Sequence, residues 1–255
     1  MKILAISPFF PYPPDHGGRI RTYLLLRELA RLGHAVHLIP LIEREGEKKH
    51  VLALAKDEIT TTPVLHPRRF GRLCIRDRLR KGANLILGRS DVLSRFWAPA
   101  ALLAARSLDI DSWDVVLSEL LWTAPLALAI AARSHVLNAH NVETVIARRT
   151  AADTGGLFSR GAAHLEARGM HRDEARLVSR FDSVVVVSEE DRRHMQTLVP
   201  AAELEVIGNC VDTDVLKVLE PRPPKPHPSA SSWGVPTIPR TGEPSRDSPA
   251  PSFPW

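Results

Sequence analysis

The chain has 255 residues, of which 44% are hydrophobic and 25% are charged, and its formal net charge is +5. This composition is that of a globular α/β-sized protein with enough apolar residues for a core. The two cysteines, Cys74 and Cys210, are too few for a disulfide framework or a metal cluster, which points to a reducing cytoplasm. The apolar N-terminal run is cut at Pro8, too early for a signal peptide, and no apolar run reaches the ~20 residues of a spanning helix.

The N-terminal segment predicts a βαβ unit. The apolar run Lys2–Ser7 is typical of a buried parallel strand, and a Pro- and Gly-rich loop follows over Pro8–Gly18. From Arg19 the apolar residues recur at helical spacing, and Gly33 stands where a helix C-cap favours a positive φ. A second strand is predicted at Ala35–Pro40.

The rest of the domain continues to alternate strands with helices. Further strands are predicted at Thr60–Leu65, Asp114–Ser118, His135–Ala139, Ser183–Val187 and Leu204–Ile207. Helices are predicted within Arg68–Leu108, at Ala124–Ala132, at Val142–Thr150, at Arg160–Arg180 and after Ser188, which should cap the last of them. This order predicts an α/β fold with a Rossmann-like, doubly wound parallel sheet.

The composition changes near residue 220. Residues 1–219 should form the domain, whereas residues 220–255 are rich in Pro and Ser, lack apolar periodicity and are predicted to be a disordered tail. The chain therefore has the organisation expected for one half of a two-domain enzyme. A frame-shifted or truncated end explains the tail at least as well as a Pro-rich ligand motif.

A basic segment lies between Arg68 and Arg95. It contains nine cationic residues and only two carboxylates, Asp77 and Asp91. The cationic residues are Arg68, Arg69, Arg72, Arg76, Arg78, Arg80, Lys81, Arg89 and Arg95. Such a segment suits an anionic partner such as the inner face of a cell membrane, and a solvated helix face explains it equally well. Nucleic acid is not among the predicted partners.

Several polar residues follow predicted strands, where ligands bind in open α/β sheets. His140, Asn141 and Glu143 come directly after the strand that ends at Ala139. Glu119 follows another strand and has Trp122 nearby; a carboxylate with an aromatic neighbour suits a sugar, although a helix-entry Glu beside a core Trp is an equal alternative. No cluster of His, Cys and Asp has metal-ligand spacing.

Gly17 and Gly18 stand at a predicted helix N-terminus. There the backbone N–H groups and the helix dipole can hold an anion such as a diphosphate, although a flexible turn that starts a helix is an equal alternative. The spacing differs from the G-x-G-x-x-G fingerprint, which argues against a nicotinamide cofactor.

Six segments follow one another in a recognisable order: SPFFPYPPDHGGRIRTYLLLRELARLGHAVHL (7–38), DVVLSELLWTAPLAL (114–128), LNAHNVET (137–144), the charged helix around Glu166–Arg180, FDSVVVVSEEDRRHM (181–195) and VIGNCVDTDVL (206–216). On these segments, across about residues 1–216, the sequence resembles the amino-terminal domain of family 4 glycosyltransferases of the GT-B fold. The form of the first segment is most similar to bacterial exopolysaccharide sugar transferases.

The resemblance implies transfer of a sugar from a nucleotide diphosphate donor to a saccharide or lipid-linked acceptor of the envelope or exopolysaccharide. The anomeric configuration would be retained, with no obligatory metal and no cofactor besides the donor substrate. The match to Gly17 and Gly18 implies a place near the donor phosphates and the acceptor, and the match to His140 implies a place at the donor sugar near the reaction centre. Arg21, Glu119, Asn141 and Glu143 are expected to bind substrate or donor.

In the family the amino-terminal half mainly binds acceptor and the carboxyl-terminal half binds most of the nucleotide sugar. We therefore expect this chain to be inactive alone and to need a C-terminal half, for which a separate chain is one possible source. The alternative is a non-catalytic remnant or subunit that holds an acceptor, a membrane surface or a partner transferase. At the domain crossover Gly208 replaces the usual Pro and Cys210 replaces a Gly whose positive φ a Cys adopts poorly.

Overall fold

The computed structural model of the chain describes residues 1–67, 75–108, 113–210 and 212, with the backbone alone for residues 75–78. Its strands are β1 (Lys2–Ser7), β2 (Ala35–Ile42), β3 (Ile59–Thr61), β4 (Val64–Leu65), β5 (Trp113–Glu119), β6 (Ala132–Asn138), β7 (Ser183–Val186) and β8 (Leu204–Val206). They pair in parallel in the order β3-β2-β1-β5-β6-β7-β8, with β4 beside β2. This sheet confirms the predicted Rossmann-like α/β fold.

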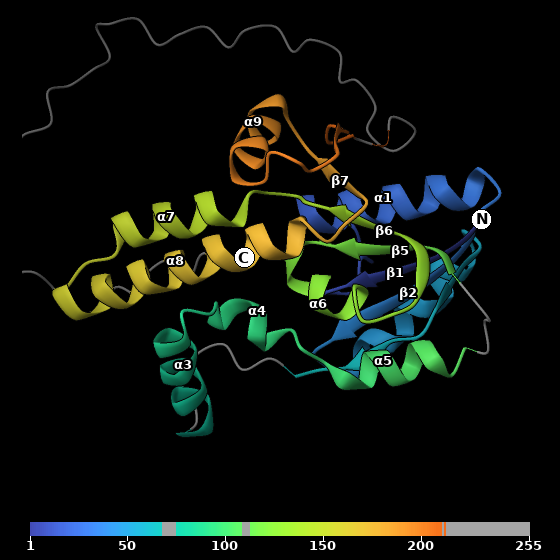
Figure 1. Cartoon of the computed structure of the whole chain (residues 1–255). Helices are drawn as coiled ribbons and strands as arrows, with labels where there is room; N and C mark the ends of the chain where they lie inside the picture. The colour runs from blue at the N-terminus through green and yellow to red at the C-terminus, as the bar shows by residue number, and fades with distance from the viewer. Residues whose placement is uncertain (68–74, 109–112, 211, 213–255) are drawn as a thin grey trace, which may run out of the picture. The chain divides into compact units, whose positions relative to one another are not determined.

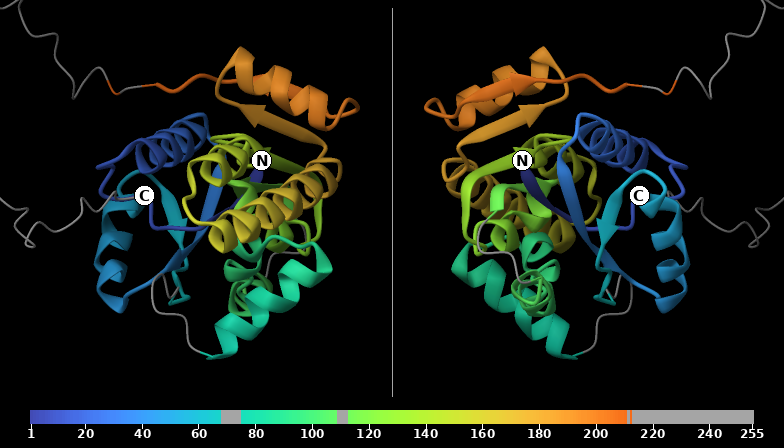
Figure 2. Two further views of the ribbon diagram at one scale, coloured as in Figure 1. Left: turned by 90° about the vertical axis from the view of Figure 1, so that its left-hand side faces the viewer. Right: turned by 90° about the vertical axis from the view of Figure 1, so that its right-hand side faces the viewer.

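Helices cover both faces of the sheet. They are α1 (Gly17–Arg31), η1 (Glu45–His50), α2 (Val51–Ala55), α3 (Ile75–Leu87), α4 (Asp91–Arg95), α5 (Pro99–Arg106), η2 (Leu121–Thr123), α6 (Ala124–Ala127), α7 (Glu143–Asp153), α8 (Leu157–Val178) and α9 (Glu189–Leu198). Figures 1 and 2 show α1 on one side of the sheet and α5 on the other.

The alternation of side chains along β1 explains the two layers. Ile3 and Ala5 pack with Leu26 of α1, whereas Leu4 and Ile6 pack on the opposite face with Ala101 of α5 and its neighbours. Because both faces of β1 are buried over residues 3–6, these four residues are all apolar, which is typical of a central parallel strand. The strand order reverses at β1, so the carboxyl ends of β1 and β5 border the crevice where such sheets bind ligands.

Two predicted boundaries are wrong. The strand predicted at Thr60–Leu65 is two short strands, β3 and β4, because Pro63 between them has no N–H to donate to a ladder. The helix predicted at Ala124–Ala132 ends at Ala127, and Ala132 already pairs with Trp113 in the sheet. Sheet pairing here outweighs the high helix propensity of alanine.

The cap predictions at the helix ends are confirmed. Gly33 has a φ of +80°, and the Ser188 hydroxyl accepts a hydrogen bond from the backbone N–H of Asp191 at 3.1 Å. Cys210, in contrast, does not take the left-handed conformation of the glycine it replaces: the non-glycine residues with positive φ in the described part are Glu58 and Leu120. The substitution therefore introduces no backbone strain at this position.

The long helix α8 also holds other helices by its carboxylates. Glu174 accepts the backbone N–H groups of Glu143 and Thr144, both at 2.8 Å, and so caps α7. Glu166 accepts the hydroxyl of Ser90 at 2.6 Å and the N–H of Asp91 at 3.0 Å, at the start of α4. Both caps satisfy backbone donors that have no partner within their own helices. Within the described residues, no helix combines the length and the apolar character needed to cross a membrane.

Candidate functional site

Two neighbouring strands end in a buried polar pair. Glu119 closes β5 and Asn138 closes β6, and the two residues are partners in the sheet register. The Asn138 side-chain amide donates to the Glu119 carboxylate oxygens at 3.0 and 3.2 Å. Both residues are fully buried, so the carboxylate depends on such donors in place of water.

His140 completes this pair from the loop after β6. Its Nε2 lies 3.0 Å from a Glu119 oxygen, and because a carboxylate can only accept, Nε2 carries the hydrogen. The other ring nitrogen, Nδ1, is directed toward the start of α1, where a Cβ placed on Gly18 would lie 3.8 Å from it. The buried carboxylate thus fixes the ring orientation and leaves Nδ1 for a ligand.

Helix α1 adds a hydroxyl and a cation to the cluster. The Thr22 hydroxyl donates to Glu119 at 2.8 Å. The Arg21 guanidinium donates to the side-chain oxygen Oδ1 of Asn138 at 2.9 and 3.2 Å, and to the backbone carbonyl of Ile207 at 2.8 Å. Burial lowers the pKa of Arg21, and the charge of Glu119 opposes that effect. Arg21 therefore joins α1, β6 and the segment after β8.

The glycine pair forms the first residues of α1, after the N-cap His16. A Cβ on Gly17 would meet nothing within 4 Å, and one on Gly18 would lie in ordinary contact with Phe9, 3.5 Å away, and with His140. The first turn of α1 holds no acidic residue. The His16 ring accepts the Arg19 N–H at 3.5 Å, and the positive end of the helix dipole lies close to His140, which suits an anionic group.

The backbone directly after Glu119 is strained. Leu120 has φ 68° and ψ 155°, a conformation that residues other than glycine rarely adopt, yet its side chain is buried. Its N–H donates to the carbonyl of Asn138 at 3.1 Å, which holds the turn in place. Such strain costs roughly 1–3 kcal/mol and concentrates at functional sites. Here it directs the chain away from the sheet immediately after the carboxylate.

Asn141 and Glu143 lie apart from this cluster. Asn141 is exposed beside His140, whereas Glu143 is buried near Glu174. Burial, and then the charge of Glu174, raise the pKa of Glu143 to about 7, and the nearby Trp122 side chain opposes the shift. Within the described part of the chain, no hydrogen bond joins the Glu143 side chain to Glu119 or His140.

The structure thus brings together Gly18, Arg21, Glu119 and His140, four of the residues selected from sequence. Sequence reasoning missed Asn138 and Thr22. Asn138 had a signal, since it is a polar residue inside an otherwise apolar strand end. Thr22 lies four residues after Gly18, on the same face of α1. In the described residues, no group of three or more His, Cys, Asp or Glu side chains is placed to hold a metal.

The basic segment is partly used inside the protein. Residues 68–74 lie outside the described residues, as does the tail at 220–255. Arg80 and Arg95 both pair with the buried Asp91, at 3.4 and 2.7 Å, and so do not face solvent freely. Arg89 is exposed, and so are three apolar residues of α3: Leu79, Ile86 and Leu87.

Comparison with known proteins places the chain among glycosyltransferases. The family model of Glycosyltransferase Family 4 matches residues 16–215. An "Uncharacterized 44.6 kDa protein in cps region" of Klebsiella pneumoniae is 24% identical over 198 residues, which are 74% of this chain and 46% of that protein. The chain therefore spans about half the length of the curated relative it matches.

A solved structure, that of apo UGT2 from Phytolacca americana, is similar to the chain with a TM-score of 0.46 and 10% identity, over 84% of this chain and 53% of that one. The family model covers most of the described domain, including α1, the Glu119–Asn138 pair and His140. The chain belongs to glycosyltransferase family 4.

Proposed function

We propose that this chain forms the acceptor-side wall of a retaining glycosyltransferase cleft. The enzyme would move a sugar from a nucleotide diphosphate donor to an envelope or exopolysaccharide acceptor. The observation that carries the proposal is His140, whose ring the buried Glu119 orients so that Nδ1 faces the start of α1. The relative in a cps region supports a polysaccharide acceptor.

The geometry suggests how the residues divide the chemistry. With Nε2 donating to Glu119, the tautomer that leaves Nδ1 unprotonated has a lone pair there, which can accept a hydrogen bond from a donor-sugar hydroxyl. The N-terminus of α1 would stabilise negative charge on the departing diphosphate or on an acceptor phosphate. The bond between the anomeric carbon and the diphosphate breaks, the acceptor hydroxyl oxygen forms a bond on the same face of the sugar, and the hydroxyl proton passes to the departing diphosphate.

We further propose that most contacts to the nucleotide come from the part of the family's proteins that this chain does not span. Stabilisation of the leaving diphosphate is then shared between the two parts, and residues 1–255 alone give no steady turnover. The alternative is a non-catalytic binding subunit. Acceptor binding by this chain, without turnover when a family 4 carboxyl-terminal half is supplied, would favour that alternative.

Helix α3 supports a proposal about location. Leu79, Ile86 and Leu87 are exposed on a helix that belongs to the basic segment, a combination that suits the surface of an anionic membrane. We propose that the chain works in the cytoplasm and contacts the inner face of the cell membrane through this helix. Binding to anionic vesicles that weakens as salt rises would support the proposal, and equal binding to neutral vesicles would contradict it.

A matched pair of substitutions tests the catalytic proposal. In the chain joined to a family 4 carboxyl-terminal half, Gly18→Ala adds a methyl group beside His140 Nδ1, whereas Gly17→Ala adds one in open space. We expect the KM for the donor to rise roughly tenfold in Gly18→Ala only, about the loss of one hydrogen bond. Alanine is the better helix former, so neither variant should lose thermal stability. Equal KM values in both variants would place the donor elsewhere.

A further inference from the structure

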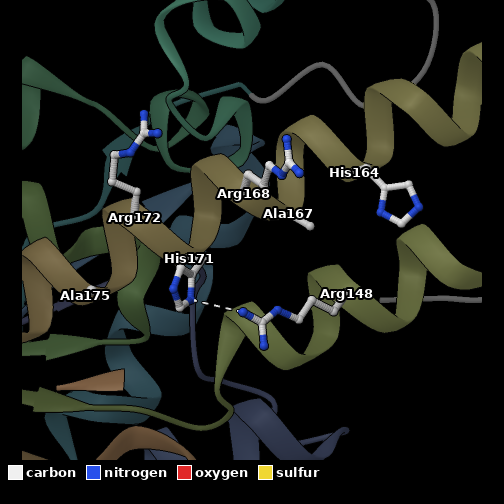
Figure 3. Close-up of a pocket in the computed structure, with 7 residues that line it drawn as sticks. All are labelled: Arg148, His164, Ala167, Arg168, His171, Arg172 and Ala175. Carbon is white, nitrogen blue, oxygen red and sulfur yellow. Dashed lines mark hydrogen bonds between the residues drawn. The ribbon is translucent and has the colours of Figure 1, made fainter. Parts of the chain in front are cut away.

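A basic hollow lies along α8, on elements that the proposed catalytic site does not use. It has a volume of about 650 Å³ and is lined by five basic side chains and two alanines: Arg148, His164, Ala167, Arg168, His171, Arg172 and Ala175. Figure 3 shows Arg148 reaching from α7 toward His171, which lies 3.4 Å away, while Arg168 and Arg172 leave α8 on its other edge. The small side chains of Ala167 and Ala175 leave the space between them open.

The charge of this hollow is only partly neutralised locally, by the effect of the buried Glu174 on Arg148. The three acidic residues of α8 make hydrogen bonds outside the hollow. Glu166 and Asp173 accept the N–H and hydroxyl donors around Ser90, and Glu174 caps α7. Within the described residues, Arg168 and His164 pair with no carboxylate. Because the acidic side chains of α8 bond to the starts of other helices, one face of α8 has an excess of cationic side chains. Such a face attracts a multiply charged anion.

An apolar tip continues the same face of α8. Leu157 and Phe158 begin the helix and are 86% and 94% exposed, so they contact almost nothing in the described structure. Leu157 precedes His164 by two helical turns, about 10 Å along the axis, and so lies on the same stripe as the basic side chains. The stripe is therefore amphiphilic along its length, apolar at the tip and cationic beyond it.

We propose that this stripe binds a phosphorylated lipid, with its phosphate or diphosphate head in the basic hollow and its hydrocarbon against Leu157 and Phe158. Arginine in a fixed geometry suits phosphate oxygens, and an exposed Leu–Phe pair suits acyl or prenyl chains. The C-terminal end of α3 borders the hollow, since Arg172 donates to the carbonyl of Gly88 at 3.0 Å.

Vesicle sedimentation of the full chain tests the proposal. The vesicles contain phosphatidylcholine alone or phosphatidylcholine with phosphatidic acid. We expect Arg148→Gln with Arg168→Gln to lower partition onto the anionic vesicles about thirtyfold, a factor of about five for each lost charge. The control, Arg149→Gln with Arg180→Gln, changes the net charge equally at exposed positions outside the hollow and should cost less than threefold.

The apolar tip has its own matched pair. Leu157→Ser with Phe158→Ser should lower partition at least tenfold, whereas Leu32→Ser with Leu52→Ser, at other exposed leucines, should not. Soluble farnesyl diphosphate distinguishes a lipid-linked diphosphate from a bilayer phospholipid. Displacement of the protein from vesicles by farnesyl diphosphate indicates a lipid-linked diphosphate, and no displacement indicates a bilayer phospholipid.

Two results would overturn the proposal. Equal losses in the hollow and control arginine pairs would reduce it to general charge attraction. If inorganic pyrophosphate competes as strongly as farnesyl diphosphate and the serine pair has no effect, the hydrocarbon chain does not contribute to binding and the ligand is not a lipid. Because sedimentation needs no turnover, these results are independent of the proposed transferase activity.

Discussion

The Glu119 cluster at the sheet edge and the basic hollow on α8 use the same kinds of side chain in opposite ways. At the sheet edge Arg21, Glu119 and His140 are buried, and hydrogen bonds within the protein satisfy the carboxylate and the guanidinium. In the hollow, Arg148 of α7 and Arg168 of α8 are exposed, and in the described structure neither makes a close ion pair with a carboxylate, although the charge of Arg148 acts on the buried Glu174. Burial makes the first cluster part of the fold, whereas exposure leaves the second free to bind. Loss of the buried carboxylate in the first cluster should therefore affect stability, whereas substitutions in the hollow should affect binding.

The largest effect on stability is expected from Glu119→Ala. It leaves the donors of Thr22, Asn138 and His140 without their acceptor, and it leaves Arg21 as an uncompensated buried cation. Removal of one partner from a buried charged network costs about 3–5 kcal/mol. Urea unfolding followed by circular dichroism measures this loss. Glu205→Ala, at an exposed carboxylate of β8, is the control and should change little.

His140→Ala should act mainly on chemistry. Glu119 keeps its bonds to Thr22 and Asn138, so the variant should lose only about 1 kcal/mol of stability. In the chain joined to a family 4 carboxyl-terminal half, kcat should fall about 10²–10³-fold, the usual cost of one group that acts at the transition state. Turnover and urea midpoint are measured on the same preparation. An unchanged kcat, or a stability loss as large as that of Glu119→Ala, would make the histidine purely structural.

Glu143→Gln should stabilise the protein at alkaline pH. The pKa of Glu143 is raised to about 7 from a model-peptide value of 4.5, so the folded state binds the extra proton between these pH values. The contribution of Glu143 to the free energy of unfolding is then largest below pH 4.5 and declines as pH rises to 7, by about 3 kcal/mol at most. The amide variant should gain about 1–3 kcal/mol at pH 8 and nothing at pH 4.5.

Unfolding titrations of this variant and of the exposed control Glu190→Gln would settle the sign. A gain that is the same at both pH values would show that relief of the buried charge is not its cause.

The smallest effect on stability is expected in the hollow. Arg148→Gln with Arg168→Gln removes exposed charges, and such substitutions usually change the free energy of unfolding by less than about 0.5 kcal/mol. Thermal melting with and without phosphatidic acid vesicles measures both properties at once. A loss comparable to that of Glu119→Ala would mean that these arginines hold α7 and α8 together.

The sequence predicted the sheet better than the site. Strand β7 and the first βαβ unit were predictable because apolar runs and helical periodicity are local signals. The strand-end rule also found Glu119 and His140, but it could not separate them from Glu143, which enters α7 in the next turn and is buried near Glu174. That difference depends on packing between α7 and α8, distant in sequence from the loop. The hydrogen bonds of the α8 carboxylates could likewise not be predicted from the sequence, since their partners lie up to 83 residues away.

The caps that α8 supplies join parts of the molecule that the chain separates. Glu174 holds the start of α7 and Glu166 the start of α4, so neither helix can lose its first turn without disturbing α8. Amide hydrogen exchange should therefore detect α4, α7 and α8 as one opening unit with a common free energy, apart from the slower strands of the sheet. In a cooperative unit of this kind, binding of a ligand to the α8 stripe would affect the loop that carries His140, because this loop directly precedes α7.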